Sequence, residues 1–425
     1  MRILVIGSGG REHAICWALS NSPGVSKLYC APGNAGTTEI AQNVDIAASD
    51  TEELISFAKN VDINLTICPM EEPLVNGIAD AFAQAGLALF GPSRDAAHIE
   101  GSKAYAKDFM RKYRIPAAKS EAFDNFHDAM AYVTSLRFPC VIKADGLAAG
   151  KGVIICPNAE TADRALHQIL SDRKFGDAGN KVLVEEFLEG IECSVLAFCD
   201  GESIVPMPGA KDHKAAFDGD RGPNTGGMGV YTPCPQYTEE IAKECMKKIF
   251  LPTIKGLREE DREFVGVLYF GLMLTEDGPK MLEYNCRPGD PETQALLPLL
   301  ETDLLKVMLA CMNKKLDNME IKWKNNAVCC VVAASGGYPE AYKVGYPIVG
   351  LSIDIEDVKI FHSGTRADKG NVLTNGGRVL SVVASGTDLE NARSKAYEAL
   401  SNIRFRDMKF RKDIGDLTPR NMEIP

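Results

Sequence analysis

The stretch CVIKADGLAAGKGVIIC (residues 140–156) indicates a β-hairpin with a glycine-rich connecting loop. The apolar runs at 140–144 and 153–156 have the length and β-branched content of buried strands, and they flank the glycines on both sides. Two helical patterns and one further strand surround the hairpin, at residues 125–135, 159–170 and 181–185. We therefore predict a small α+β unit in which two antiparallel strands carry a glycine flap.

This glycine loop is not a P-loop. Only three residues separate Gly146 from Gly150, and Gly152 follows Lys151 where a P-loop has serine or threonine. A loop of this kind can instead close its backbone N–H groups over triphosphate oxygens and exclude water. Lys143 lies on the strand that enters the loop, and a lysine inside an apolar strand needs a charged partner such as phosphate. We predict that Lys143 and the loop hold a nucleotide.

Toward the N-terminus, strand and helix signals alternate. The expected strands are residues 2–6, 27–31, 65–68 and 88–90, and the expected helices are 12–21, 51–60 and 74–85. This alternation predicts a doubly wound parallel sheet, in which ligands bind at the carboxyl ends of the strands.

The segment GSGGREH (residues 7–13) joins the first strand to the first helix. Gly7 and Gly9 fit a dinucleotide fingerprint, but Glu12 occupies the place of its third glycine, and no acidic residue lies at the expected ribose position. Backbone N–H groups at a helix N-terminus suit an anion. A phosphate on a small substrate, with Arg11 as its partner, therefore fits better than NAD, and a tight structural turn is the alternative.

Downstream of the flap, the expected strands are residues 193–199, 265–275, 280–285, 327–333 and 378–385, with a helix at 389–403. Glu283 and Asn285 lie two residues apart on one strand, so their side chains share a face. Their oxygens suit Mg²⁺, which takes its other ligands from water and nucleotide phosphates. The alternative is a polar strand end with Arg287 paired to Asp290. A further glycine loop, GPNTGGMGVYTP (residues 222–233), follows KDHK and implies close backbone approach to a ligand.

The composition of the 425-residue chain is that of a globular protein of two to four domains, 45% hydrophobic and 25% charged. A net charge of −11 without a long basic run argues against a broad nucleic-acid surface. Thirteen cysteines without a C-x-x-C pair are expected to be reduced and to pack as small apolar side chains. The apolar run that precedes Gly7 is too short for a signal peptide or membrane span, so we expect a cytoplasmic protein.

Together, these segments resemble the ATP-grasp superfamily and, within it, the glycinamide ribonucleotide synthetase family. The resemblance extends from Met1 to RKDIG near the C-terminus, and GGREHA, GLAAGKGV and GPNTGGMG are its most specific parts. Its other segments are APGNAGT, EPLVNG, FGPS, EGSKAYAKDFM, EEFLEG, KDHK, EYNCRPGDPETQ and NGGRVL.

The resemblance implies a multidomain α/β and α+β protein: an N-terminal doubly wound parallel sheet, an ATP-grasp fold and a small C-terminal α+β domain. The expected bounds are 1–101 for the N-terminal substrate-binding domain, 102–120 and 189–325 for the central ATP-grasp domain, 121–188 for the B flap, and 326–425 for the C-terminal domain. The implied reaction joins glycine to 5-phosphoribosylamine through glycyl phosphate, giving glycinamide ribonucleotide, ADP and phosphate in purine synthesis.

The same resemblance assigns roles to individual residues. The nucleotide phosphates would lie against Lys103, Lys143, Gly146, Gly150, Lys151 and Gly152. Adenine would be framed by Glu185, Glu186, Phe187 and Leu188, while Glu192 would accept from the ribose hydroxyls, and Glu283 and Asn285 would bind Mg²⁺ or Mn²⁺. Phosphoribosylamine would face Gly9, Gly10, Arg11, Glu12, Asn34 and Glu71. Glycine and its phosphorylated carboxylate would be surrounded by Asp212, Asn224, Thr225, Gly226, Gly227 and Arg287. The expected catalytic residues are Lys143, Asp212 and Arg287.

Some positions depart from the family pattern. The usual G-P-E reads Pro69-Met70-Glu71, Glu72 replaces a small residue, and Pro288 stands where an aromatic residue is usual. Pro288 removes a backbone N–H beside Arg287, so we expect the substrate pocket to differ locally.

Two alternatives stay open at this point. One is another ATP-grasp ligase or carboxylase with a different acceptor. The other is a nucleotide-binding regulatory protein without turnover. We expect small-molecule substrates, no nucleic-acid or membrane partner, and a monomer or a weak homodimer.

Overall fold

The computed structural model describes residues 1–147, 152–352 and 355–418. Its N-terminal part holds a five-stranded parallel sheet with the order β3-β2-β1-β4-β5. The strands are β1 Arg2–Gly7, β2 Lys27–Pro32, β3 Gln42–Asn43, β4 Leu65–Ile67 and β5 Leu89–Phe90. After the exposed Arg2, all residues of the central strand β1 are buried, as a parallel strand covered on both faces requires. The predicted parallel sheet is confirmed.

Short helices connect these strands. They are α1 Gly10–Ser20, η1 Thr37–Glu39, α2 Thr51–Asn60, α3 Glu71–Val75, α4 Ile78–Gln84 and α5 Arg94–Gly101. The prediction of one helix over 74–85 is wrong, because α3 and α4 are separate helices that meet at Gly77. Gly77 has a φ of +91°, a left-handed conformation that glycine adopts readily and that interrupts a helix.

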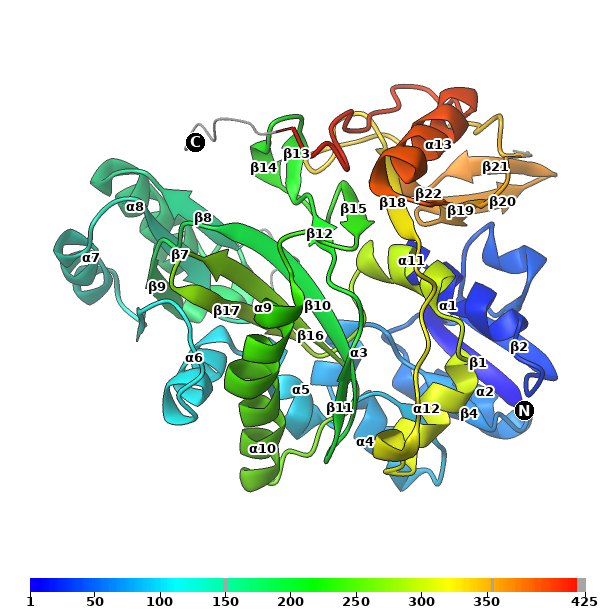
Figure 1. Ribbon diagram of the computed structural model, residues 1–425, viewed down its shortest axis with the longest axis horizontal. Helices are drawn as coiled ribbons and strands as arrows, with labels where there is room; N and C mark the ends of the chain where they lie inside the picture. The colour runs from blue at the N-terminus through cyan, green and yellow to red at the C-terminus, as the bar shows by residue number, and fades with distance from the viewer. Residues whose placement is uncertain (148–151, 353–354, 419–425) are drawn as a thin grey trace.

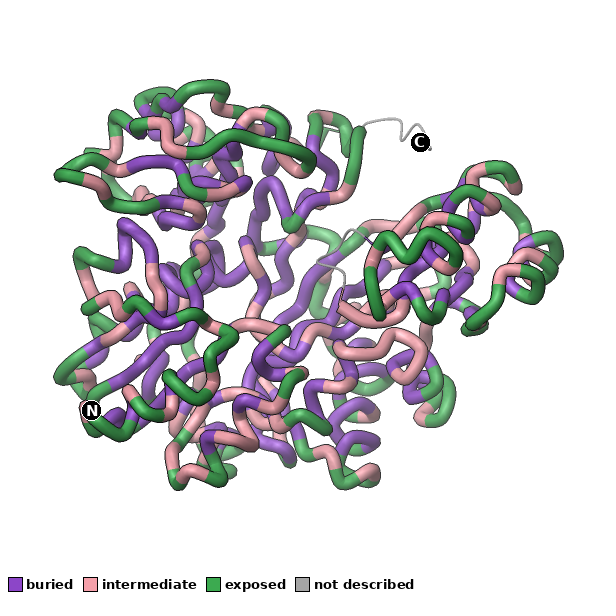
Figure 2. The backbone as a smooth tube through the Cα atoms, turned by 180° about the vertical axis from the view of Figure 1, so that it is seen from behind, coloured by how far each residue is buried: buried purple, intermediate pink, exposed green. Residues whose placement is uncertain are grey.

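The predicted hairpin lies in a four-stranded antiparallel sheet with the order β6-β9-β7-β8. Its strands are β6 Ser120–Phe123, β7 Cys140–Ala144, β8 Val153–Cys156 and β9 Val182–Glu186, with helices α7 Phe126–Ser135, α8 Ala159–Leu166, η2 His167–Ser171 and η3 Gly176–Asn180. This unit packs a hydrophobic core of its own and projects from the rest of the molecule (Figure 2). The two strands that flank the glycine loop have the predicted bounds.

The central sheet is antiparallel and has the order β11-β10-β16-β17. Its strands are β10 Ile191–Asp200, β11 Ile204–Pro206, β16 Val265–Thr275 and β17 Gly278–Asn285. The associated helices are α6 Lys103–Lys112, α9 Glu239–Cys245, η4 Met246–Phe250, α10 Leu251–Glu259, α11 Glu292–Leu296, η5 Leu297–Leu299, α12 Leu304–Met312 and η6 Leu316–Asn318. Buried apolar residues continue from the N-terminal sheet into this unit, so the two share their cores.

The C-terminal sheet recruits strands from far upstream. Its order is β12-β15-β18-β22-β19, and α13 packs on β18 and β22 (Figure 1). The elements are β12 Lys211–Asp212, β15 Gly229–Thr232, β18 Ala327–Ala334, β19 Val358–His362, β22 Arg378–Gly386 and α13 Leu389–Asn402. Two separate hairpins lie outside this sheet: β13 Ala215–Phe217 pairs with β14 Arg221–Asn224, and β20 Thr365–Asp368 pairs with β21 Asn371–Thr374. The predicted strands and helix are present, but the pairing of β15 with β18 was not predicted.

All thirteen cysteines are free and buried, which confirms that they pack as small apolar side chains. In the described parts of the chain, no helix has both the length and the apolar character needed to cross a membrane.

Two buried histidines join the N-terminal and C-terminal parts. The backbone N–H of His362, at the end of β19, donates to Nδ1 of His13 on α1 at 2.8 Å. Burial and the neighbouring His362 lower the pKa of His13 to about 3, and burial lowers the pKa of His362 to about 4. Both imidazoles are therefore neutral in the folded protein at neutral pH.

We predict that this interface loses stability in mild acid. The unfolded chain takes up protons at both histidines below its pKa of 6.5, whereas the folded chain does not. The contribution of the two neutral histidines to the free energy of unfolding is thus fully present above that pH. It falls as the pH decreases, by about 2 kcal/mol per histidine at pH 5. In the H13N variant a side-chain amide oxygen can replace Nδ1, so chemical denaturation should show a smaller loss between pH 7 and pH 5 than in the wild type. The exposed His127 supplies the control, H127N, and an equal loss in H13N and wild type would contradict the prediction.

Candidate active site

One cavity of about 390 Å³ lies between the flap sheet, the central sheet and the loops of the N-terminal part. It collects most of the residues that the sequence analysis singled out. Those that line it are Arg11, Glu71, Lys103, Lys143, Gly146, Gly152, Glu185, Glu186, Phe187, Leu188, Glu192, Asp212, Asn224, Thr225, Gly226, Glu283, Asn285 and Arg287. Residues that are more than 250 positions apart along the chain, such as Arg11 and Arg287, thus meet at one site.

The flap side of the cavity holds more positive than negative charge. Nζ of Lys143, on β7, lies 3.0 Å from one carboxylate oxygen of Glu185, on β9, and Nζ of Lys107, on α6, lies 3.2 Å from the other. Nζ of Lys103, at the start of α6, donates to the carbonyl of Gly146 at 2.6 Å. Burial lowers the pKa of Lys107 to about 8 and also lowers the pKa of Lys103. Two ammonium groups share the one carboxylate of Glu185, which leaves positive charge that a phosphate would neutralise.

The start of the glycine loop is attached to α6. The carboxylate of Asp145 accepts from the Ser102 hydroxyl and from the backbone N–H of Ala104, both at 3.1 Å. The loop therefore leaves β7 directly above the lysines. Gly150 and Lys151 lie outside the described residues.

A β-bulge directs the predicted metal ligands into the cavity. Gly271 of β16 pairs with Glu283, but the next residue, Leu272, pairs with Met281, so Leu282 is the extra residue. The bulge lets Leu282 and Glu283, although consecutive, both line the cavity, and Asn285 then shares the face of Glu283.

The donor set fits a hard divalent ion. Burial would raise the pKa of Glu283, but the ammonium groups of Lys214, Lys143 and Lys103 outweigh it and lower the pKa to about 2. An ionised carboxylate and an amide oxygen are two of the ligands that Mg²⁺ accepts when phosphates and water supply the others. Among the described residues, no group of three or more His, Cys, Asp or Glu side chains forms a closed metal site.

The glycine loop of residues 222–233 packs against a buried carboxyl group, that of Asp212 on β12. Gly227 has a φ of +107°, and a Cβ there would lie 2.7 Å from Oδ1 of Asp212, so glycine is required. This oxygen has no hydrogen-bond partner among the described residues. Burial and the neighbouring Glu292 raise the pKa of Asp212 well above its usual range. A ligand ammonium group placed here would supply the missing partner.

Arg378, from the C-terminal part, fixes this loop. Its guanidinium donates to the carbonyl of Gly226 and, at 2.7 Å, to the carbonyl of Asp290, and it lies 3.3 Å from the Asp290 carboxylate. The alternative pairing of Arg287 with Asp290 is therefore wrong, because Arg378 takes that carboxylate.

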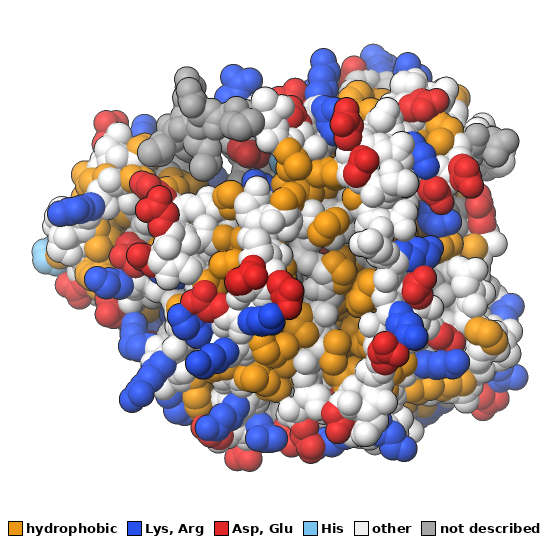
Figure 3. Space-filling view, viewed as in Figure 1, with side chains coloured by type: hydrophobic (Ala, Val, Ile, Leu, Met, Phe, Trp, Pro, Cys, Tyr) orange, Lys and Arg blue, Asp and Glu red, His pale blue; other side chains and the backbone are white. Residues whose placement is uncertain are grey.

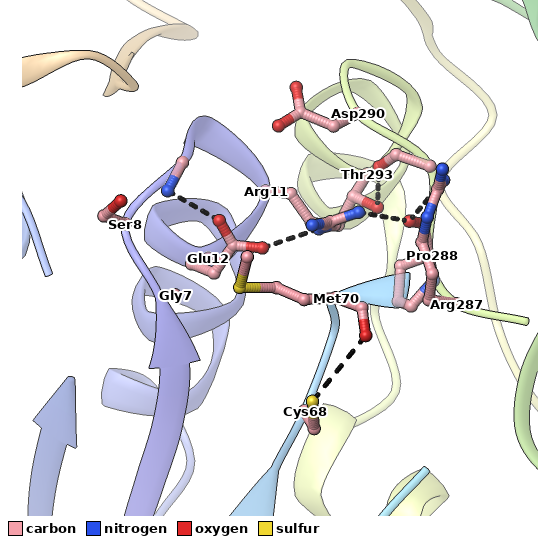
Figure 4. Close-up of polar contacts among 12 residues, drawn as sticks. Gly7, Ser8, Arg11, Glu12, Cys68, Met70, Arg287, Pro288, Asp290 and Thr293 are labelled. Atoms are coloured by element: carbon pink, nitrogen blue, oxygen red, sulfur yellow. Dashed lines mark hydrogen bonds and ion pairs between the residues drawn. The ribbon is translucent and has the colours of Figure 1, made fainter. Parts of the chain in front are cut away.

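At the N-terminal edge, two arginines converge (Figure 4). Nε of Arg287 donates to Glu71 at 3.0 Å, and Arg11 lies 4.0 Å from the same carboxylate. Both guanidinium groups also donate to the carbonyl of Pro288, at 3.1 Å from Arg11 and 3.3 Å from Arg287. Burial would raise the pKa of Glu71, but Arg287 and Arg11 lower it to about 2. The unusual Pro288 thus contributes its carbonyl oxygen to the arginine pair.

Glu12 serves the fold of the loop that precedes α1. Its carboxylate accepts from the backbone N–H of Gly9 and from Nε of Arg11, each at 2.6 Å. A Cβ on Gly7 would lie 2.9 Å from the sulfur of Met70, the other unusual residue, which extends beneath the loop in Figure 4. Glycine at position 7 therefore leaves the space that Glu12 and Met70 fill.

Comparison with known proteins identifies the family to which the chain belongs. Models of the N domain, the ATP-grasp (A) domain and the C domain of phosphoribosylglycinamide synthetase match residues 1–100, 101–293 and 328–417. A phosphoribosylamine–glycine ligase of Halalkalibacterium halodurans is 48% identical over 98% of this chain and 96% of its own length. The chain belongs to the phosphoribosylglycinamide synthetase family. The resemblance predicted from the sequence is confirmed.

Solved structures agree with this family. The crystal structure of a phosphoribosylamine–glycine ligase from Thermotoga maritima superposes with a TM-score of 0.85 at 35% identity, covering 97% of this chain and 100% of that one. The biotin carboxylase domain of Hydrogenobacter thermophilus 2-oxoglutarate carboxylase, solved with MgADP and bicarbonate, has a TM-score of 0.77 at 15% identity over 96% of this chain and 91% of its own. The second likeness concerns the fold alone. The predicted ATP-grasp architecture is confirmed by the family model that matches residues 101–293.

Some residues that the family resemblance indicated do not line the cavity. Gly9, Gly10, Glu12 and Gly227 shape the loops that carry lining residues. Asn34 is buried, and its amide bonds to the backbone of Ser8, Gly36, Thr37 and His362. Its role in substrate binding stays a prediction.

Several lining residues were missed in the sequence. They are Glu100, Lys107, Lys214, Glu292 and Arg378. Lys107 lies one helical turn after Lys103, and Lys214 ends the KDHK segment, so a spacing signal was available for these two. Arg378 belongs to the segment NGGRVL that carries part of the resemblance, but no role was assigned to it, because contacts between distant parts of the chain bring it to the loop.

We predict that Glu185→Gln destabilises the protein by about 3–5 kcal/mol, because it leaves two buried ammonium groups without their counter-charge. Chemical denaturation measures the loss. The matched control is Glu239→Gln, which breaks an exposed pair with Lys243 and should cost less than about 1 kcal/mol. Equal stability of the two variants would contradict a structural role for the Glu185 cluster.

Proposed function

We propose that the protein ligates glycine to 5-phosphoribosylamine at the expense of ATP, through glycyl phosphate, and releases glycinamide ribonucleotide, ADP and phosphate in purine biosynthesis. One observation carries the proposal: a single cavity combines excess ammonium charge, an acidic metal-binding face, an unpaired carboxyl group and a pair of arginines. Family membership and the name of the relative at 48% identity support it.

The first step transfers the γ-phosphoryl group of ATP to the glycine carboxylate. Phosphoryl transfer depends mostly on positioning and on neutralising charge. Lys107 and Lys143, which share Glu185, supply that charge, and Lys103 contacts the carbonyl of Gly146 at the start of the loop. In our proposal this loop covers the phosphates and keeps water from the acyl phosphate.

Glycine must present its carboxylate and not its amine. The buried carboxyl group of Asp212, with Glu292 beside it, suits the glycine ammonium group. Binding there keeps the amine protonated and therefore unreactive. The Asn224–Gly226 loop, which Arg378 fixes, would then hold the carboxylate toward the nucleotide.

In the second step the amine of phosphoribosylamine attacks the acyl carbon, and inorganic phosphate leaves. Arg11 and Arg287 are proposed to hold the phosphate of the sugar and the departing phosphate, since planar guanidinium groups match such anions. Holding both reactants in line can contribute on the order of 7–11 kcal/mol.

Glu283 and Asn285 are proposed to hold Mg²⁺ or Mn²⁺, which when bound would neutralise charge on the transferring phosphoryl group. The residues around this site keep Glu283 ionised.

We further propose a cytoplasmic monomer or weak homodimer without nucleic-acid or membrane partners. Thirteen buried thiols accord with a reducing compartment. The net charge is −11, and acidic and basic side chains are interspersed on the face shown in Figure 3.

The decisive experiment measures ADP release by the purified protein. We expect release only when ATP, glycine and phosphoribosylamine are all present, with glycinamide ribonucleotide as the product. ADP release with another acid or amine, but not with this pair, would identify a different ATP-grasp ligase. ATP binding without any release would identify a nucleotide-binding regulatory protein.

We predict that Lys143→Ala and Glu283→Ala each slow turnover roughly 100–1000-fold, because each removes one preorganised charge at the transferring group. Circular dichroism should show an intact fold in both variants. Turnover close to that of the wild type in either variant would remove that residue from the proposed mechanism.

A further inference from the structure

Lys214 lies between two carboxylates of the cavity. It follows β12, and its Nζ is 3.5 Å from Oε2 of Glu192 and 3.5 Å from Oε1 of Glu283. Glu192 is on β10 and Glu283 is on β17, the strands on either side of β16. The ammonium group therefore spans the central strand and neutralises an acid on each neighbour.

The backbone of Lys214 is fixed, whereas its side chain has room to move. Its carbonyl accepts from the backbone N–H and from the hydroxyl of Thr225, both at 2.8 Å, which attaches it to the glycine loop of residues 222–233. Its side chain is 31% exposed, and both ion pairs are longer than a close contact. A change of rotamer can thus break the pair with Glu283 without moving the main chain.

The contact with Glu283 conflicts with the role of that carboxylate. A divalent ion would bind a Glu283 oxygen at about 2.0–2.1 Å, and a second cation held 3.5 Å from the same oxygen would be strongly repelled. The ion and the ammonium group therefore compete for Glu283. Without the ion, however, Glu283 and Glu192 need a counter-charge, because two unpaired carboxylates in one cavity are costly.

We propose that Lys214 is a positioning residue whose ammonium group neutralises Glu283 in the metal-free protein. When a divalent ion binds Glu283, the ammonium group leaves that carboxylate and stays with Glu192. This inference rests on the metal role assigned to Glu283 under the proposed function. It accounts for a lysine that lies at the same distance from two acids of the cavity, Glu192 and Glu283, whereas Lys107 and Lys143 share the carboxylate of Glu185. The exchange keeps the charge near Glu283 balanced before and after the ion arrives.

The test is a titration of the nucleotide-free protein with Mn²⁺ alone, followed by electron paramagnetic resonance. Lys214→Met removes the competing cation, so we expect it to bind Mn²⁺ about tenfold more tightly than the wild type. In chelator, the variant should have a lower Tm than the wild type, and Mn²⁺ should raise its Tm by more. Despite tighter binding, its turnover should fall, because Glu192 is left in the cavity without the ammonium group that neutralises it.

Two controls isolate the charge. Lys214→Arg keeps a cation and should bind Mn²⁺ within about twofold of the wild type. Lys211→Met removes the lysine that begins β12, which does not line the cavity, and should change neither affinity nor turnover. Equal, weaker or undetectable Mn²⁺ binding by Lys214→Met would overturn the proposal. The outcome is independent of whether the wild type ligates glycine, since failure of the ADP-release assay would reject the proposed function while the metal titration still decides the role of Lys214.

Discussion

The shared carboxylate of Glu185 is the interaction on which the cavity depends. It holds Lys107 from α6 and Lys143 from β7, and so joins the flap sheet to the helix that precedes it. The pair of lysines leaves one positive charge uncompensated, and Lys103 adds another at the mouth of the loop. Burial, and after it the neighbouring Lys143, lower the pKa of Lys107 to about 8, and an anionic ligand would stabilise its charged form. The folded protein thus keeps positive charge in the cavity that an anionic ligand would neutralise.

Acidic side chains also line the cavity. Glu283, Glu192, Asp212 and Glu292 all line it, and Lys214 is the cation placed among them. A nucleotide has anionic phosphates that suit the lysine side, and a divalent ion or an ammonium group suits the acidic side. The cavity of about 390 Å³ therefore offers charged partners both for anions and for cations.

Local sequence patterns predicted most strands and helices well, but they did not predict contacts between distant parts of the chain. The strands that flank the glycine loop, β7 and β8, have the predicted bounds because apolar runs between glycines and polar residues define them. The break at Gly77 was missed, since a glycine within a helical pattern does not by itself reveal a positive φ. Half of the residues that line the cavity were predicted through the family resemblance. Arg378 was not, because its contacts with Gly226 and Asp290 depend on the pairing of distant strands.

That pairing also connects the C-terminal part to the chemistry. β15 pairs with β12 on one side and with β18 on the other, so the segment between β12 and β15 is attached to the C-terminal sheet at both of its ends. This segment carries Lys214 and Thr225, and Arg378 reaches back from β22 to its carbonyls. A displacement of the C-terminal sheet would therefore move the glycine loop and the lysine together, relative to Glu283 on the central sheet. The fold makes the spacing between Lys214 and Glu283 a property of how two sheets pack, and not of one loop.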